Sequence, residues 1–280
     1  MTSLPLEESY DSSNGKVVIA YRDQGNSNRG TAIVGTVSGT SITFGSAVLY
    51  HSNTVNHVSA TYDSSNGKVV IAYQDEANSD YGTAIVGTVS GTSISFGSSA
   101  VFESSDCDDI AAVYDSANGK VVIAYRDDGD SDKGKAVVGT VSGTSISFGT
   151  PVVFESSNIS QYSTSATFDS TNNKVVIVYA DFGNSRYGTV INGTVSGTSI
   201  SFGTTLVFES AITDYSSVTY DSTNDKSVVV YRDGGNSSYG TASVITSDTL
   251  SSSLTAENYI GISNGAYSDG QTATIQLIGS

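Results

Sequence analysis

The chain has 280 residues, of which 29 are glycine and 2 are proline, and it carries a formal net charge of −16. A surface this acidic repels phosphate backbones and anionic bilayers, which argues against nucleic acid and membrane surfaces as partners. The sequence has no apolar run of the ~18 residues that a membrane span requires and no signal peptide, so we expect a soluble protein without membrane insertion. Its single cysteine, Cys107, excludes an internal disulfide.

One segment is repeated along the chain, and its first copy reads Tyr-Asp-Ser-Ser-Asn-Gly-Lys-Val-Val-Ile-Ala-Tyr. The copies begin at Tyr10, Tyr62, Tyr114, Phe168 and Tyr220, at steps of 52, 52, 54 and 52 residues. Repeats of ~40–50 residues are typical of β-propeller blades, which cannot bury their apolar faces alone. We therefore predict an all-β fold, a five-bladed β-propeller over residues 1–264 with repeats starting near residues 6, 57, 109, 163 and 215. Residues 265–280 lie outside the repeats.

The second copy shows how each repeat divides into four antiparallel strands. We expect strands at 57–63, 68–75, 83–90 and 93–102. A Ser-Ser-Asn-Gly turn, a loop over 76–82 and a Gly-Thr turn separate them. Four antiparallel strands are the pattern of a propeller blade.

The second strand of the repeat is apolar on both of its faces, as in Val17–Tyr21. A sheet with one face in water would instead alternate apolar and polar residues. The pattern therefore predicts a blade that packs between two neighbouring blades.

The fifth repeat departs from the others because it lacks the Ser-Ile-Ser-Phe-Gly fourth strand. Either Leu254–Ser263 supplies that strand or Thr272–Ile278 closes the ring, and the sequence leaves both open. The chain ends at Ser280 directly after a strand-like run, from which we expect a fragment of a longer protein.

The copies differ mainly at one end of their strands. In an up-and-down blade, the loop between the second and third strands lies on the same face as the connection to the next blade. Both segments vary strongly among the copies, whereas the turns of the opposite face are nearly the same. Variable loops on a rigid scaffold are typical of a binding surface, although unconstrained drift would give the same pattern.

Residues that break the repeat are candidates for the binding site, because a site needs groups that differ from blade to blade. In the blade-to-blade connections they are His57, Asp108, Asp109, Gln161, Tyr162, Asp214 and Tyr215. Three tyrosines at the ends of the second-to-third-strand loops join them: Tyr81, Tyr187 and Tyr239. Tyrosine, amide and carboxylate groups suit binding by stacking and adaptable hydrogen bonds, as sugars require. His51 and Cys107 also break the repeat, but we expect a solvated histidine and an unreactive thiol.

Charged residues recur at the end of each second strand. The acids are Asp23, Asp75, Asp127, Asp181 and Asp233, and three of them follow Arg22, Arg126 and Arg232. We expect the acids to fix the following loop by accepting backbone N–H bonds. The arginines either pair with neighbouring acids or clamp a ligand carboxylate. Residues 23–26 offer oxygen ligands of the calcium type but not a full set, so we predict no cofactor and no metal site.

Two resemblances bear on these expectations. The segment Val89–Gly97 resembles a degenerate Asp-box hairpin of sialidases, with phenylalanine in place of the usual tryptophan. The whole repeat is similar to repeats in predicted tail or fibre proteins of marine bacteriophages, and residues 257–276 resemble a C-terminal module of those proteins. The second resemblance implies a recognition role on the virion (phage particle) and brings no known site residues.

Taken together, the sequence predicts a non-enzymatic recognition module that binds a glycan or a host cell-surface receptor through one loop face. One alternative is a sialidase-like glycoside hydrolase, whose carboxylate pair would come from Asp108, Asp109 and Asp214. Another alternative is a structural spacer in the virion. The sequence does not identify the ligand or the oligomeric state.

Overall fold

The computed structural model describes residues 6–246 and 249–252, and this part of the chain is almost entirely β-structure. The all-β prediction is confirmed. One hydrogen-bonded sheet contains β1 (Leu6–Asp11), β2 (Lys16–Asp23), β3 (Arg29–Ser38), β4 (Ser41–Phe44), β5 (Val48–Asp63), β6 (Lys68–Asp75), β7 (Tyr81–Ser90), β8 (Ser93–Phe96), β9 (Ala100–Asp115), β10 (Lys120–Asp127), β11 (Lys133–Ser142), β12 (Ser145–Phe148) and β13 (Val152–Asn158). A second sheet contains β14 (Ser165–Asp169), β15 (Lys174–Asp181), β16 (Tyr187–Ser196), β17 (Ser199–Phe202), β18 (Leu206–Asp221), β19 (Lys226–Asp233), β20 (Tyr239–Thr246) and β21 (Thr249–Ser252).

Antiparallel pairing divides these strands into successive units, which we number from the N-terminus. Each unit runs from an inner strand through two central strands to a short outer strand. The units are β1–β4; the second half of β5 with β6–β8; the second half of β9 with β10–β12; β14–β17; and the second half of β18 with β19–β21.

Three of the four connections between the described units are strands rather than the loops that we expected. β5, β9 and β18 each run for 16 residues. The first half of each extends the outer edge of one unit, and the second half is the inner strand of the next. Continuous extended chain satisfies the backbone N–H and C=O groups in two ladders, which a loop would leave to water.

A bulge interrupts each long strand at the same place. In β5, for example, two residues lie opposite one residue of β6 between the pairs Asn56–Gln74 and Ser59–Ala72. The first bulged residue has a left-handed backbone, with φ of 46° at His57, 51° at Asp109 and 52° at Tyr215. Such bulges bend a strand and redirect a side chain.

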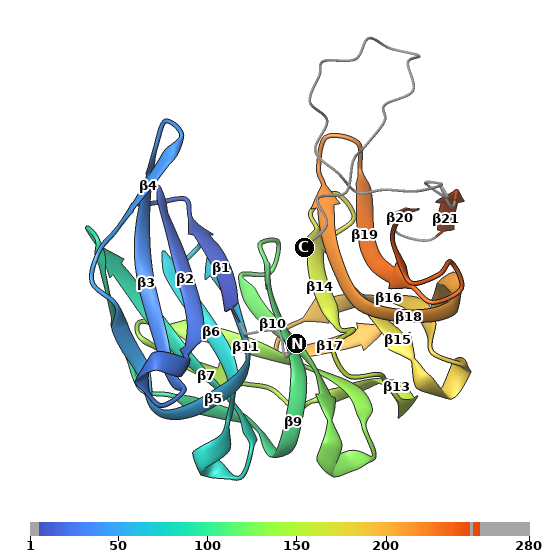
Figure 1. The fold of residues 1–280 in the computed structure, drawn as a ribbon, viewed down its shortest axis with the longest axis horizontal. Helices are drawn as coiled ribbons and strands as arrows, with labels where there is room; N and C mark the ends of the chain where they lie inside the picture. Colours follow the sequence, from blue (N-terminus) through green and yellow to red (C-terminus); the bar gives the residue numbers. More distant parts are fainter. Residues whose placement is uncertain (1–5, 247–248, 253–280) are drawn as a thin grey trace.

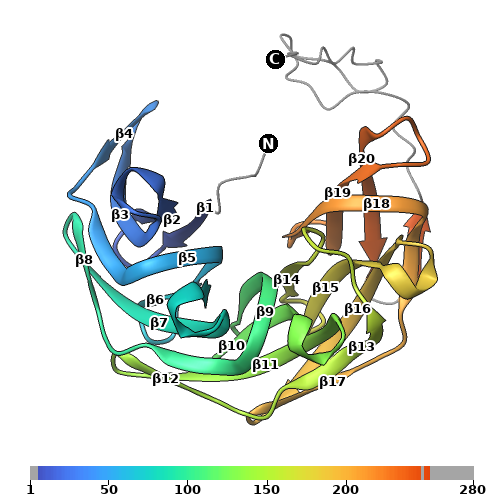
Figure 2. The same ribbon diagram turned by 60° about the horizontal axis from the view of Figure 1, so that its bottom comes forward.

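The units follow one another along an arc, with β4, β8, β12 and β17 on its outer edge (Figure 2). Neighbouring inner strands touch: the Ala112 amide donates to Ser59 Oγ over 3.0 Å, and the Val218 amide donates to Ser165 Oγ over 3.1 Å. Within the described residues no strand pairing joins the first unit to the fifth, and the arc is open between them (Figures 1 and 2). The closed ring that we expected is therefore not completed by the residues that the structure describes.

The core lies between units. This confirms the prediction made from the second strand of the repeat, which is apolar on both of its faces. Val69, Ile71 and Tyr73 of β6 are buried against Val18 and Val34 of the preceding unit. The next junctions repeat this packing in further apolar clusters. Burial on both faces makes each unit depend on its neighbours for stability.

Recurrent aspartates fix the turns. After each first strand, one carboxylate accepts the backbone N–H groups two and three residues on, as Asp63 does from Ser65 and Asn66 over 3.0 Å. After the second strand, Asp75, Asp181 and Asp233 accept backbone N–H bonds from the following loop, as predicted. Asp127 is bound instead by Ser105 Oγ, at 2.7 Å, and by Lys135 Nζ, at 2.5 Å.

β21 pairs with β20 and gives the fifth unit a fourth strand just before the first of the two segments that we considered for it. Leu254–Ser263, Thr272–Ile278 and the non-repeat segment 265–280 lie outside the described residues. Among the described residues no helix is long and apolar enough to span a membrane.

Candidate functional site

The bulges bring side chains from successive units to one end of the inner strands. We call this group the axial cluster: His57, Asp108, Asp109, Gln161, Tyr162, Asp214 and Tyr215. These residues belong to units two, three and five and to the connection between units three and four. The cluster contains seven of the ten predicted site residues.

Three of its rings form a row. The ring centroids of His57 and Tyr162 are 5.7 Å apart, and those of Tyr162 and Tyr215 are 6.4 Å apart, with interplanar angles of 22° and 23°. Tyr162 is 46% exposed and Tyr215 is 59% exposed, so a large part of each ring is open to solvent. Arg232 continues the row, with its guanidinium carbon 5.9 Å from the Tyr215 ring centroid.

Tyr162 lies in the longest of the connections between units. The connection between units three and four holds two more residues than the others and forms a turn at Gln161 and Tyr162 instead of a continuous strand. Tyr162 has φ of 61°, so its backbone is left-handed like that of the three bulged residues. The insertion thus places an aromatic ring between the rings of units two and five.

A buried carboxylate anchors this turn. Asp109 Oδ2 accepts the backbone N–H groups of Ser163, at 3.0 Å, and Thr164, at 2.8 Å, while the Asp109 amide donates to His57 Nδ1 over 3.1 Å. Burial raises the pKa of Asp109 to about 6, against the lowering effect of those two amides. Burial also lowers the pKa of His57, which keeps Nδ1 free to accept.

Asp108 belongs to a charged network beside the row. Its Oδ2 atom accepts from Arg126 over 2.8 Å and from the Gln161 side chain. Arg126 also contacts Asp128 at 2.8 Å and Asp132 at 2.7 Å. Burial and the nearby Asp108 charge raise the pKa of Asp128 to about 7, although Arg126 opposes the shift.

Asp214 is held by two arginines from different units, Arg186 and Arg232, the second at 2.9 Å. Sequence reasoning missed Arg186. Its position is Asn28, Asp80, Asp132 and Ser238 in the other copies, so the rule that selected the other candidates would have found it. The arginines of the second strands do not form one carboxylate clamp, because Arg126 and Arg232 each neutralise an aspartate of their own unit.

Tyr81, Tyr187 and Tyr239 are not part of the axial cluster. They are the first residues of β7, β16 and β20, which are each separated from the inner strand of their unit by a second strand.

His51 lies between Tyr73 Oη, at 3.3 Å, and Asp75, at 3.0 Å, and is not the solvated loop histidine that we expected. Cys107 is buried, and burial raises the pKa of its thiol well above the usual value.

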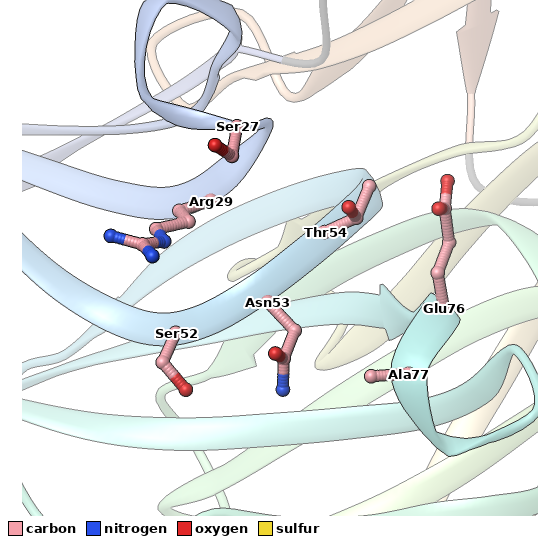
Figure 3. Close-up of a pocket in the computed structure, with 7 residues that line it drawn as sticks. All are labelled: Ser27, Arg29, Ser52, Asn53, Thr54, Glu76 and Ala77. Atoms are coloured by element: carbon pink, nitrogen blue, oxygen red, sulfur yellow. The ribbon is translucent and has the colours of Figure 1, made fainter.

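A separate pocket of about 400 Å³ lies between units one and two (Figure 3). Its walls come from the segment that leads into β3, the middle of β5 and the loop after β6, and consist of Ser27, Arg29, Ser52, Asn53, Thr54, Glu76 and Ala77. Sequence reasoning missed all of these residues, because the candidates that it selected lie near the inner strands or are loop tyrosines. Within the described chain, no group of three or more His, Cys, Asp or Glu side chains is arranged to hold a metal ion.

No protein-family model matches the sequence, and no characterised protein sequence matches it significantly. Solved structures do resemble the fold. The BP39L lectin from Burkholderia pseudomallei aligns with a TM-score of 0.64 at 10% identity, over 91% of this chain and 71% of that chain. The SapL1 lectin, solved in complex with alpha methyl fucoside, aligns with a TM-score of 0.54 at 14% identity, over 91% of this chain and 81% of that chain.

A sialidase mutant from Trypanosoma rangeli, described as displaying trans-sialidase activity, aligns with a TM-score of 0.51 at 14% identity, over 86% of this chain and 44% of that chain. At these identities the likeness concerns the fold alone. The chain therefore has the β-propeller architecture that these lectins and sialidases share.

The axial cluster offers two partly exposed tyrosine side chains beside fixed charged and amide groups. Its carboxylates are engaged by arginines, by an amide side chain or by backbone N–H groups. Such an arrangement is suited to stacking and hydrogen bonding of a polar ligand.

Proposed function

We propose that the protein is a carbohydrate-binding module that recognises a glycan through the axial cluster. The row of His57, Tyr162 and Tyr215 is the observation that carries this proposal. The two half-exposed tyrosine side chains offer apolar ring surface for contact with a sugar, while Arg232 and Gln161 supply donors for hydroxyl groups. The lectin fold of the similar structures supports the proposal.

The test is a glycan array followed by titration of any glycan that binds. Replacing Tyr162 or Tyr215 by Asn removes the ring but keeps a residue that tolerates the left-handed backbone. We expect each variant to bind roughly 5- to 30-fold more weakly, since an aromatic contact contributes about 1–2 kcal/mol. Tyr10→Asn is the matched control, because Tyr10 is 60% exposed on β1 away from the cluster.

An array without any ligand would remove the support for glycan recognition and favour a structural spacer. Equal binding by Tyr10→Asn and Tyr215→Asn would place the ligand elsewhere on the molecule.

A glycoside hydrolase of sialidase-like architecture is the second candidate. It draws on the sialidase among the similar structures and on Asp108 and Asp214. Both carboxylates are buried and paired with arginines, which limits their access to a glycosidic bond. Turnover of a fluorogenic glycoside that is abolished by Asp108→Asn or Asp214→Asn would favour catalysis over binding alone.

The wider setting is also a proposal. The likeness of the repeat to phage tail or fibre repeats supports a place on a virion, where the ligand would be a host cell-surface glycan or receptor. We further propose that the repeats make up a five-bladed propeller, on the basis of the five copies in the sequence.

A further inference from the structure

The pocket between units one and two differs in sequence from the matching places at the other junctions. Arg29 corresponds to Tyr81, Lys133, Tyr187 and Tyr239 in the other copies, and Asn53 corresponds to Ser105, Ser157 and Ala211. Ala77 stands where the next three units have Gly129, Gly183 and Gly235. The pocket residues therefore break the repeat, as the residues of the axial cluster do.

The glycines show why this junction is open. A Cβ atom added to Gly129 would lie 2.4 Å from Ser105 Cβ, and one added to Gly183 would lie 2.5 Å from Ser157 Cβ. One added to Gly235 would lie 2.5 Å from Ala211 Cβ. At those junctions the two segments touch because one of them has no side chain. Ala77 carries a Cβ, so the segment around Asn53 must stay farther away, and the pocket opens between them (Figure 3).

The pocket contains a cation without an acidic partner. Arg29 is partly buried, and no carboxylate of the described residues lies within 4.0 Å of its guanidinium. Its side chain makes one long bond, of 3.4 Å, to Asn26 Oδ1. Arg126, Arg186 and Arg232 are by contrast each paired with aspartates. In a chain of net charge −16, an unpaired guanidinium in a pocket is available for a ligand anion.

The other walls favour hydroxyl groups. Ser27, Ser52, Asn53 and Thr54 line the pocket with hydroxyl and amide groups, and Glu76 lies at the end opposite Arg29 (Figure 3). Glu76 accepts a bond from the Asn56 side chain, which fixes its carboxylate. The two ends thus have opposite charge, so an anionic group is attracted to Arg29 and repelled from Glu76, where a hydroxyl donor fits.

We propose that this pocket binds a small hydroxylated carboxylate of the uronic-acid type, with its carboxylate on Arg29 and its hydroxyl groups toward Asn53 and Glu76. The volume, about 400 Å³, is that of a pocket for one small ligand. The site is distinct from the axial cluster and goes beyond the proposed function.

Titration of glucuronate and galacturonate against the full chain, followed by backbone amide chemical shifts, tests the proposal. We expect at least one of them to shift amides around Arg29, Asn53 and Glu76, and uncharged glucose or galactose to bind at least tenfold more weakly. Arg29→Gln should weaken uronate binding roughly 10- to 100-fold, because hydrogen bonds to a charged group contribute about 1.5–3 kcal/mol.

A second variant leaves Arg29 in place and closes the pocket. Asn53→Ser combined with Ala77→Gly gives these two positions the residues that the junction between units two and three has there, Ser105 and Gly129. We expect it to fold with an unchanged circular dichroism spectrum and to lose uronate binding. Tyr162→Asn should keep uronate binding. The experiments therefore distinguish failure of the proposal for the axial cluster from failure of the proposal for this pocket. The proposal is overturned if neither uronate shifts pocket amides at millimolar concentration, or if binding survives closure.

Discussion

At the scale of single residues, Asp109 shows how burial governs charge in the axial cluster. Its carboxylate has a pKa of about 6 in the folded protein, against 3.8 for an unperturbed aspartate. The folded state therefore binds this proton more tightly than the unfolded state does. The resulting stabilisation is fully present below pH 3.8 and is lost as the pH rises through about 6.

Replacement of Asp109 by Asn tests this link between charge and stability. The amide cannot ionise, yet its oxygen can accept the Ser163 and Thr164 N–H groups that the carboxylate accepts. Between pH 4 and pH 7 we expect the wild type to lose on the order of 2 kcal/mol relative to the variant. Urea unfolding at both pH values measures this change, and a constant difference between the two proteins would contradict it.

The residue scale also shows what the sequence could and could not predict about the site. Residues that break the repeat were recognisable, and the structure brings His57, Tyr162 and Tyr215 together. The pocket was not recognisable from the sequence, because it depends on whether two Cβ atoms from different units collide. The presence of Ala77 in place of the equivalent glycines indicates a pocket only once the fold shows that Asn53 lies opposite Ala77.

At the scale of elements, the strands themselves follow from the sequence and the bulges do not. β6 has the bounds that turn residues and apolar pattern predict, Lys68–Asp75, because both of its ends are marked by turn-forming residues. The left-handed residues of the bulges are His57, Asp109 and Tyr215, and none of them is glycine, the residue type that most often adopts positive φ. The sequence pattern therefore predicts loops where the structure has bulged strands.

The left-handed backbone at Tyr215 predicts an unusual order of stability among the variants at this position. Asn tolerates positive φ, whereas a β-branched side chain is strained there, at about 1–2 kcal/mol. We therefore expect Tyr215→Val to be less stable than Tyr215→Asn by about that amount, although valine is otherwise the better strand residue. Chemical unfolding of both variants gives the comparison. A more stable valine variant would show that the bulge is absent in solution.

At the scale of the whole molecule, the first unit has an uncovered apolar face. Val37 is 58% exposed, Ile42 is 41% exposed and Phe44 is 48% exposed. Their counterparts in the second unit pack against the first, so that Val89 is 7% exposed and Ile94 is 3% exposed. The same residues of the repeat are therefore core in one unit and surface in another, because the first unit has no preceding unit among the described residues.

This difference predicts that the same substitution, isoleucine to alanine, lowers the free energy of unfolding by different amounts at two equivalent positions of the repeat. Ile94→Ala removes buried methyl groups and should lower the free energy of unfolding by about 2–4 kcal/mol, whereas Ile42→Ala should cost less than about 1 kcal/mol. Both variants keep the same hairpin sequence around the changed residue except for one threonine in place of serine. Urea unfolding of each against the wild type measures the costs. Equal losses would mean that the first unit is covered in solution, as it is in a propeller whose ring is closed.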